Sequence, residues 1–484
     1  MKKIGILLPL FSLPNELGIG SMGDEAYRFI DFLNKCGIKY WQILPLGITS
    51  FGDSPYQTLS CFAGEINYIN LNYLLQDNLI TIEELKQNKI ISSMVSYGEL
   101  FEKRIKILKK AYNRFLLNPS NDYEEFLKAN SWLDDYALYM ALKEHFNYRS
   151  LTDWPKEYKN KNSYENKIFK MENKDELSFH KFNQYLFFKQ WNNLKKYASK
   201  KDIQIIGDLP MYVSNDSADV FSNPDVFMID EDYKPKLKAG VPPDYFSSDG
   251  QLWGNPIYNY EYLKKTNYKW MIERFNHNLK MYDIIRLDHF RGYASYYVID
   301  KNETTARNGH WEIGPRMELF KKIRHSIHMP LRKRVIAEDL GVLTDDVEKL
   351  LKGTHLGGMK VMQFGYPDIE STNYYKNFKK NQTVYSGTHD NDTTLGWFES
   401  LDEKTKQIVL KDLNTDEKHL VDTFLTKLIN SKAKTIIIPL ADFLKLDSRG
   451  RINTPGLDKG NWSFRIKEED LNNQLIEHIK DIIK

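Results

Sequence analysis

The chain has 484 residues, of which 41% are hydrophobic and 27% charged, and this composition excludes the disordered, collagen-like and coiled-coil classes. Its 68 Lys and Arg against 65 Asp and Glu give a formal net charge of +3, too balanced to indicate a nucleic acid or an anionic membrane as partner. Two cysteines exclude a disulfide framework and a zinc cage, and no run of about 18 apolar residues indicates a membrane span, so we expect a cytoplasmic protein.

The first elements form a β-α-β unit. Apolar runs at 4–10 and 38–46 predict two strands. Between them we expect a helix from Asp24, as its N-cap, to Gly37, with an apolar face that includes Ile30. Such a unit places two parallel strands side by side in one sheet.

Six further apolar runs follow, most of them before a helical pattern, at 203–209, 284–288, 335–339, 359–364, 383–388 and 435–440. Continuous apolar strands that alternate with helices predict a parallel sheet covered on both faces, and eight such units predict closure into a barrel. The expected fold is therefore an α/β, TIM-type (β/α)8 barrel, with residues 1–484 as a single catalytic unit.

Two long stretches interrupt the alternation. Residues 47–202 contain helical patterns, such as 101–115, where apolar side chains recur at spacings of 4 and 3. We predict a large, mainly helical insertion after the second strand, which leans over the active site because loops after barrel strands open at the C-terminal face. Residues 235–258 are rich in Gly, Pro and aromatic residues and are expected to form an irregular loop over the same face.

Acidic residues gather at the carboxyl ends of the predicted strands. Asp208, Asp288, Glu338 and Asp390 lie at the ends of the third, fourth, fifth and seventh strands. Carboxylates that face one barrel mouth repel each other, which is costly unless function requires the charge. Glycoside bond exchange needs two of them, because one attacks or stabilises the sugar carbon and the other, protonated, donates to the leaving oxygen.

Arg286 and Asp288 lie two residues apart on a strand, so their side chains point to the same side. A guanidinium keeps a neighbouring carboxylate ionised and oriented, which makes Asp288 the candidate nucleophile, although the spacing alone fits a plain buried ion pair better. Glu338 has no adjacent Arg and is the candidate general acid and base. A helix N-cap shared with Asp339 is the alternative for Glu338.

Other side chains near these strand ends are suited to bind sugars. His389 and Asp390 can bond sugar hydroxyls, although a turn whose own residues satisfy them is the alternative. Aromatic faces stack on pyranose rings and amides bind hydroxyls, so a neutral oligosaccharide fits both the loops and the small net charge, whereas plain loop packing needs no ligand. The loop residues concerned are Tyr56, Tyr245, Phe246, Gln251 and Trp253.

Ordered motifs run from end to end of the chain, among them YWQILPLG (40–47), GDSPYQ (52–57), GVPPDYF (240–246), RLDHFRG (286–292), AEDLG (337–341), GTHDNDT (387–393) and NTPG (453–456). In these motifs the chain resembles the 4-α-glucanotransferases, also called amylomaltases or disproportionating enzymes, a family of the α-amylase-like clan of retaining barrel enzymes. It departs from the family pattern at Glu65, where Asn is expected, and at Leu252, where a basic residue is frequent. Neither departure falls on a catalytic position.

The resemblance implies the roles of individual residues. Asp288 is the implied nucleophile, Glu338 the acid and base, and Asp390 a third carboxylate that stabilises the transition state. The implied sugar-binding residues are Tyr56, Asp208, Tyr245, Phe246, Gln251, Trp253, Arg286, His289, His389 and Asn453. We predict no metal site, no cofactor, and a maltodextrin or α-1,4-glucan as both donor and acceptor.

The implied activity is transfer of α-1,4-glucan segments to the 4-hydroxyl of an acceptor glucan or glucose, with retention and through a covalent glycosyl-aspartate. A retaining α-glucan hydrolase is the near alternative, since it differs only in whether water or sugar completes the second step. We expect Tyr56, Phe246 and Trp253 to hold the acceptor and exclude water. A metal-dependent barrel hydrolase would use Asp208, Asp288, His289, His389 and Asp390, and a glucan-binding protein without catalysis would leave Glu338 unexplained.

Overall fold

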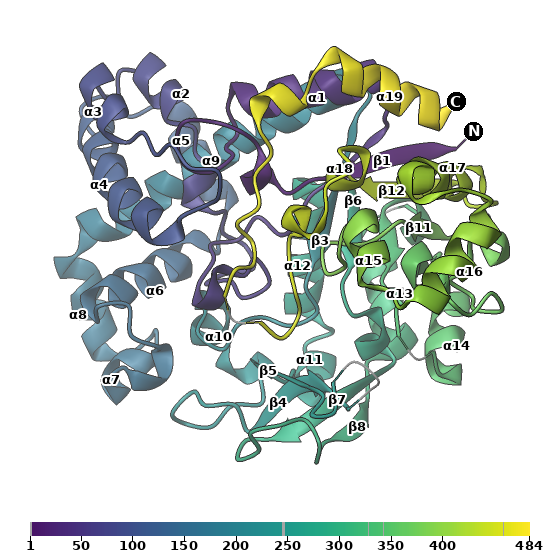
Figure 1. The fold of residues 1–484 in the computed structure, drawn as a ribbon. Coiled ribbons are helices and arrows are strands. Elements are labelled where there is room, and N and C mark those ends of the chain that lie inside the picture. The colour runs from purple at the N-terminus through teal and green to yellow at the C-terminus, as the bar shows by residue number, and fades with distance from the viewer. Residues whose placement is uncertain (1, 244–246, 328, 342, 458) are drawn as a thin grey trace.

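The computed structural model describes residues 2–484 except 244–246, 328, 342 and 458, and a sheet of eight parallel strands forms its centre (Figure 1). The strands are β1 Lys3–Leu7, β2 Tyr40–Gln42, β3 Gln204–Leu209, β6 Ile284–Leu287, β9 Val335–Ala337, β10 Met359–Val361, β11 Thr383–Tyr385 and β12 Thr435–Pro439. Their order is β10-β11-β12-β1-β2-β3-β6-β9, and a parallel bridge from Ala337 to Gly358 joins the two edges. The predicted eight-stranded barrel is therefore confirmed.

The barrel strands are short and almost wholly buried because helices cover their outer faces. Inside, the Tyr385 hydroxyl donates to Gln42 Oε1 at 2.8 Å, so a buried polar pair crosses the barrel between β11 and β2. Steric contact explains why position 207 in β3 is a glycine, because a Cβ there would lie 2.2 Å from the ring of Tyr282. Only glycine lets that ring pack against the strand.

Helices connect most successive barrel strands and pack against one another around the sheet. They are α1 Asp24–Cys36, α11 Tyr260–Lys265, α12 Lys269–Met281, α13 Arg316–Ile327, α14 Asp345–Thr354, α15 Thr394–Ser400, α16 Glu403–Leu413, α17 Leu420–Asn430, α18 Leu440–Phe443 and α19 Asn473–Ile483. The predicted end of the first helix at Gly37 is confirmed, because Gly37 caps α1 with a φ of 80°. At the other end Gly23 is the N-cap, and Asp24 is the first helical residue, where its charge suits the helix dipole.

Eight further helices lie between β2 and β3, on the left of Figure 1. They are α2 Leu71–Gln76, α3 Ile82–Gln87, α4 Tyr97–Phe115, α5 Asn121–Ala129, α6 Leu133–His145, α7 Lys156–Lys159, α8 Tyr164–Glu172 and α9 Lys174–Lys200. The long α9 contacts both parts of the fold, since it packs on α6 and also on α1, where the Tyr197 and Tyr27 rings lie 4.9 Å apart. No helix among the described residues is long and apolar enough to span a membrane.

A small antiparallel sheet, at the bottom of Figure 1, corrects the prediction of an irregular loop at 235–258. It has the order β5-β4-β7-β8, with β4 Leu237–Val241, β5 Gln251–Pro256, β7 Ser295–Asp300 and β8 His310–Ile313. The interpretation was wrong because β4 and β5 contain Gly and Pro and are only partly buried, so they lack a continuous apolar run. A short helix, α10 Ala218–Ser222, lies between β3 and this sheet in the chain.

Candidate active site

The register of two neighbouring barrel strands places the central ion pair. Asp208 on β3 lies directly opposite Arg286 on β6. Arg286 Nη1 donates to Asp208 Oδ2 at 2.7 Å and to Asp288 Oδ1 at 2.9 Å. The side chain of Asp208 is 0% exposed, whereas that of Asp288 is 28% exposed. The plain buried pair is thus Arg286 with Asp208, and Asp288 is the carboxylate that remains open to the barrel mouth.

The two carboxylates keep Arg286 charged although it is buried. Burial by itself lowers the pKa of a guanidinium, but the negative charges of Asp208 and Asp288 outweigh it and raise the pKa of Arg286 above its ordinary value. A charge-assisted contact of this kind fixes the orientation of both partners. Asp288 is therefore held by one oxygen, Oδ1, in a fixed direction.

Glu338 directly follows β9, one strand further around the barrel. Its carboxyl accepts the backbone N–H of His289 at 2.8 Å and that of Leu340 at 2.7 Å. Burial, with Asp288 adding to it, raises the pKa of Glu338 to about 7, although Arg286 and the two N–H groups oppose the shift. Glu338 is thus protonated in part of the molecules at neutral pH, as a general acid must be.

The N-cap alternative for Glu338 does not hold. The next helix, α14, begins at Asp345, seven residues beyond Glu338, and its N-cap is Thr344. Asp339 instead accepts the backbone N–H of Met359 at 2.6 Å and lies 3.7 Å from Lys360 Nζ, so it joins β9 to β10. The two adjacent acids therefore have separate surroundings, one at the mouth and one between strands.

His289 links the two carboxylates to the small sheet. Its left-handed backbone, with φ of 47°, directs its N–H to Glu338. Its ring meets that of Trp253 edge-on at 5.0 Å, and Trp253 Nε1 donates to Gln251 Oε1 at 3.1 Å. Burial lowers the pKa of His289 to about 4, so the ring is neutral at pH 7. Gln251 and Trp253 are thus brought to the site, whereas Tyr245 and Phe246 lie outside the described residues.

A second chain of polar contacts runs from Asp208 to Asp390. The Tyr56 hydroxyl donates to Asp208 Oδ2 at 2.8 Å and lies 2.9 Å from His389 Nε2, and the two rings stack at 5.2 Å. His389 Nε2 is 3.3 Å from Asp390 Oδ2, and Asn453 Nδ2 donates to Asp390 Oδ1 at 2.6 Å. Since the Tyr56 hydroxyl proton points to Asp208, its contact with His389 requires a proton on Nε2.

The turn alternative for 388–392 holds in part. Thr388 N and Oγ1 both donate to Asn391 Oδ1, and Asp390 N contacts Thr388 Oγ1 at 3.3 Å, so the turn satisfies its own backbone. These bonds use neither the His389 nor the Asp390 side chain, although the two side chains lie against each other, with His389 Nε2 3.3 Å from Asp390 Oδ2. The turn thus presents both side chains to Tyr56 and Asn453.

Two residues of this cluster were missed in the sequence. Arg451 Nη2 donates to the Asp390 carbonyl at 2.9 Å and its Nε to the Asn453 carbonyl at 2.8 Å. These bonds join the C-terminal loop, between α18 and α19, to the turn after β11. The Trp462 ring lies 5.8 Å from that of Tyr56 and 6.0 Å from that of His389. Arg451 lies two residues before the predicted site residue Asn453, and this spacing could have indicated it. No local sequence pattern indicated Trp462.

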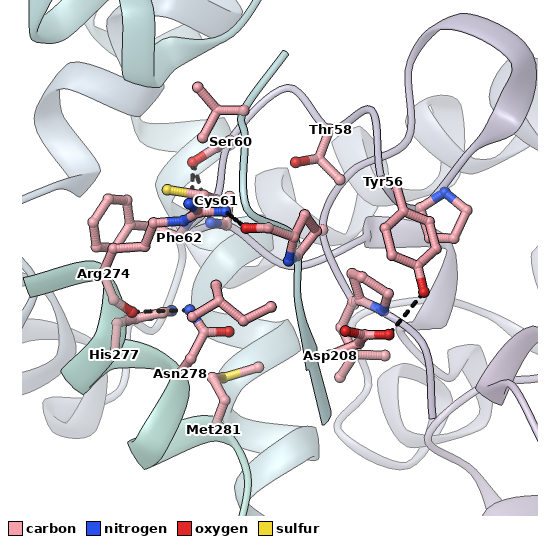
Figure 2. A pocket seen from close by; sticks show the side chains of 18 of the residues that line it. Tyr56, Thr58, Ser60, Cys61, Phe62, Asp208, Arg274, His277, Asn278 and Met281 are labelled. Carbon is pink, nitrogen blue, oxygen red and sulfur yellow. Dashed lines mark hydrogen bonds between the residues drawn. The ribbon is translucent and has the colours of Figure 1, made fainter. Parts of the chain in front are cut away.

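Figure 2 shows a small cavity beside Asp208. Tyr56 and Asp208 lie at one end, joined by their hydrogen bond, and Cys61, Arg274 and His277 at the other. Its volume of about 40 Å³ is far below the roughly 300–1,000 Å³ of small-molecule sites. A sugar ring does not fit there, so the carboxylates at the barrel mouth mark the candidate site instead.

The metal-dependent alternative lacks its ligand set. Within the described part of the chain, no three of Asp208, Asp288, His289, His389 and Asp390 bring their ligand atoms within reach of one ion. The Arg286 guanidinium occupies the position between Asp208 and Asp288 that such an ion would need. This geometry favours sugar chemistry on carboxylates.

Comparisons with known proteins agree with this geometry. A sequence model of the 4-alpha-glucanotransferases matches residues 8–472. The chain is 44% identical over 476 residues to a 4-alpha-glucanotransferase of Clostridium butyricum, with 97% of each chain covered. Its structure matches the amylomaltase from Streptococcus agalactiae in complex with acarbose, with a TM-score of 0.97, 38% identity, and 100% of this chain and 98% of that chain covered.

An amylomaltase from Corynebacterium glutamicum has the same fold at 16% identity, with a TM-score of 0.82 and with 100% of this chain and 75% of that chain covered. The resemblance read from the motifs is thus confirmed over nearly the whole length, as is the barrel. The chain belongs to the 4-alpha-glucanotransferase family.

Proposed function

We propose that the chain transfers α-1,4-glucan segments by a retaining double displacement, with Asp288 as nucleophile and Glu338 as general acid and base. Family membership makes it an enzyme that transfers glucan segments, and the proposal concerns how it does so. One observation carries the proposal: Arg286 holds a fully buried Asp208 and a partly exposed Asp288, next to a Glu338 whose pKa is raised to about 7.

In the first step an Asp288 oxygen attacks C1 of the donor sugar while Glu338 gives its proton to the glycosidic oxygen. The C1–O bond breaks, the reducing-end part of the donor leaves, and a glycosyl ester forms on Asp288. In the second step ionised Glu338 takes the proton of the acceptor 4-hydroxyl, whose oxygen attacks C1 and releases Asp288. Two inversions at C1 give net retention.

The chain from Asp208 to Asn453 is proposed to bind the donor sugar whose C1 reacts. Asn453 holds Oδ1 of Asp390, whose side chain is 43% exposed, and His389 Nε2 lies 3.3 Å from its Oδ2, so Oδ2 is the oxygen positioned to accept a sugar hydroxyl as well. Tyr56 belongs to this group, because its hydroxyl is bound to Asp208. Tyr56 is therefore assigned to the donor sugar, which differs from the sequence-based expectation that it holds the acceptor.

The defining experiment is incubation with maltotriose, with and without a chelator. Transfer yields glucose and longer maltodextrins while the number of reducing ends stays constant. A net gain of reducing ends would establish the retaining hydrolase instead, and loss of activity with chelator would establish a metal enzyme. Unchanged maltotriose would leave only glucan binding.

The pH dependence follows from Glu338. The pKa of Glu338 is raised to about 7, and the first step needs its protonated form. We therefore expect kcat/KM for maltotriose to have its full value below pH 7 and to fall as the pH rises through 7, with a slope that approaches tenfold per pH unit. Initial rates between pH 5.5 and 9 measure it. A profile that stays level from pH 6 to 9 would contradict the assignment of Glu338.

Trp253 is the described aromatic residue best placed to hold an acceptor, since its ring contacts His289 next to Glu338. Stacking contributes about 1 kcal/mol per ring, so Trp253→Ala is expected to lower the ratio of transfer to hydrolysis several-fold without abolishing cleavage. Trp253→Phe, which keeps an aromatic face, is the control and should retain most of the ratio. Equal losses of both activities in Trp253→Ala would mean that the ring only supports its loop.

Two further expectations complete the proposal. We place the enzyme in the cytoplasm, because Cys36 and Cys61 are both free thiols, as is usual in a reducing compartment. We also propose that residues 1–484 act as one catalytic unit, with 47–202 as an insertion that contributes to the glucan groove.

A further inference from the structure

A second group of polar side chains lies among the helices between β2 and β3, outside the site described above. Glu176 and His180 are one turn apart on α9, so they share a face of that helix, and Glu144 comes from α6, which packs against it. Their ligand atoms lie within 4.8 Å of one another. None of these three residues has a part in the proposed catalysis.

Three buried atoms of this group face one another without a hydrogen-bond partner among the described residues: Glu144 Oε2, Glu176 Oε1 and His180 Nε2. The nitrogen lies 3.4 Å from Glu176 Oε1 and 3.9 Å from Glu144 Oε2. The His180 side chain is only 8% exposed. Burying polar atoms without a hydrogen-bond partner costs free energy, so a bound group that contacts all three atoms would stabilise the fold.

His180 does not supply the missing positive charge. Burial lowers its pKa to about 4, so the ring is neutral at pH 7 and its contacts with the two carboxylates are not ion pairs. Two carboxylate oxygens and one imidazole nitrogen then converge on one point. A cation, a shared proton or a water molecule fits between them.

The outer carboxylate oxygens already have a partner. Lys109 on α4 lies 2.6 Å from Glu144 Oε1 and 3.4 Å from Glu176 Oε2. Lys109 therefore orients both carboxylates from outside, as hydrogen-bonding groups do around metal ligands, and leaves the inner oxygens directed at His180. Its charge also weakens cation binding, which sets a limit on the affinity.

We propose that Glu144, Glu176 and His180 bind one first-row divalent metal ion, with Zn²⁺ as the best candidate, and that this ion joins α6 to α9. Tetrahedral bonds of about 2.0–2.2 Å place neighbouring ligand atoms roughly 3.3–3.5 Å apart, close to the spacing around His180 Nε2. One imidazole and two carboxylates suit such an ion. The site departs from the expectation of no metal and has a structural role, so it is independent of the proposed function.

The competing occupant is a proton shared by the two carboxyls. Burial and the neighbouring Glu144 raise the pKa of Glu176 to about 7, while Lys109 opposes the shift. The charged and titratable groups around the point are Lys109, Glu144, Glu176, His180, Tyr112 and Tyr148. A metal ion and a shared proton therefore compete for the same position.

The test is calorimetric titration of the chelator-treated full chain with ZnCl₂. His180→Gln and Glu176→Gln each remove a ligand, and His145→Gln, at an exposed position next to Glu144 on α6, is the matched control. We expect wild type and His145→Gln to bind alike, and both ligand variants to lose one site or bind it at least about tenfold more weakly. Thermal unfolding without metal checks that the variants fold.

Lys109 gives the second measurement. Lys109→Met should bind Zn²⁺ more tightly than wild type, because it removes the opposing charge. Failure of wild type to bind Zn²⁺, or binding that is equal in wild type and His180→Gln, would overturn the proposal and leave a shared proton or a water molecule as the occupant.

Discussion

Asp288→Asn is expected to lower the transfer turnover by at least about a thousandfold, or about 4 kcal/mol of barrier, while the fold stays intact. The amide is nearly isosteric with the carboxylate, and its oxygen can still accept from Arg286 Nη1, which lies 2.9 Å from Asp288 Oδ1. The amide nevertheless cannot form the glycosyl ester at a useful rate. Glucose release from maltotriose measures the loss.

The control is Asp300→Asn at the exposed end of β7, where the side chain accepts the backbone N–H of Asn302 in a turn. It should keep wild-type turnover and thermal stability. If Asp288→Asn retained even a tenth of wild-type turnover, a barrier change of only about 1.4 kcal/mol, the nucleophile would have to be another residue.

Glu338→Gln is expected to lower transfer from maltotriose by about a hundred- to ten-thousandfold, the usual contribution of a general acid and base. Formation of the glycosyl-enzyme from α-maltotriosyl fluoride should fall far less, because fluoride leaves without a proton. The variant should also lose some stability, since the two carboxyl oxygens accept N–H groups of His289 and Leu340 and the amide can accept through only one.

Pre-steady-state release of fluoride, compared with glucose release from maltotriose, separates the two effects. Glu348→Gln, at an exposed position on α14, is the matched control and should behave as wild type. If Glu338 acts by protonation, its loss should matter little for the fluoride donor, which needs no proton. An equal loss of rate with both donors would therefore mean that Glu338 acts by positioning other groups.

The sequence predicted the barrel better than the small sheet, and burial explains the difference. Strands covered on both faces are continuous apolar runs, so the eight barrel strands were visible in the pattern. In the small sheet all residues of β8, His310–Ile313, are exposed, and β4 and β5 are interrupted by Gly and Pro. Pattern alone gave these three strands no signal, whereas β7, Ser295–Asp300, is largely buried, so burial does not explain why its apolar run was not predicted.

The sequence predicted those site residues that lie at the ends of barrel strands. Asp208, Arg286, Asp288 and Glu338 follow from the ends of three strands, but the choice of partner for Arg286 depends on register, which places Asp208 directly opposite it. Contacts between distant segments were beyond reach. Trp462 lies beside Tyr56 because the C-terminal loop packs against the loop after β2. No local sequence pattern predicts this packing.

The most direct test of the account is to identify the carboxylate that carries the sugar. Glu338→Gln mixed with α-maltotriosyl fluoride should accumulate the glycosyl-enzyme, because the second step lacks its base, and mass spectrometry of the digested protein locates the adduct. We predict one maltotriosyl group on the peptide that contains Asp288. An adduct on Asp208 or Asp390, or a first product of β configuration by NMR with no adduct, would contradict the double displacement on Asp288.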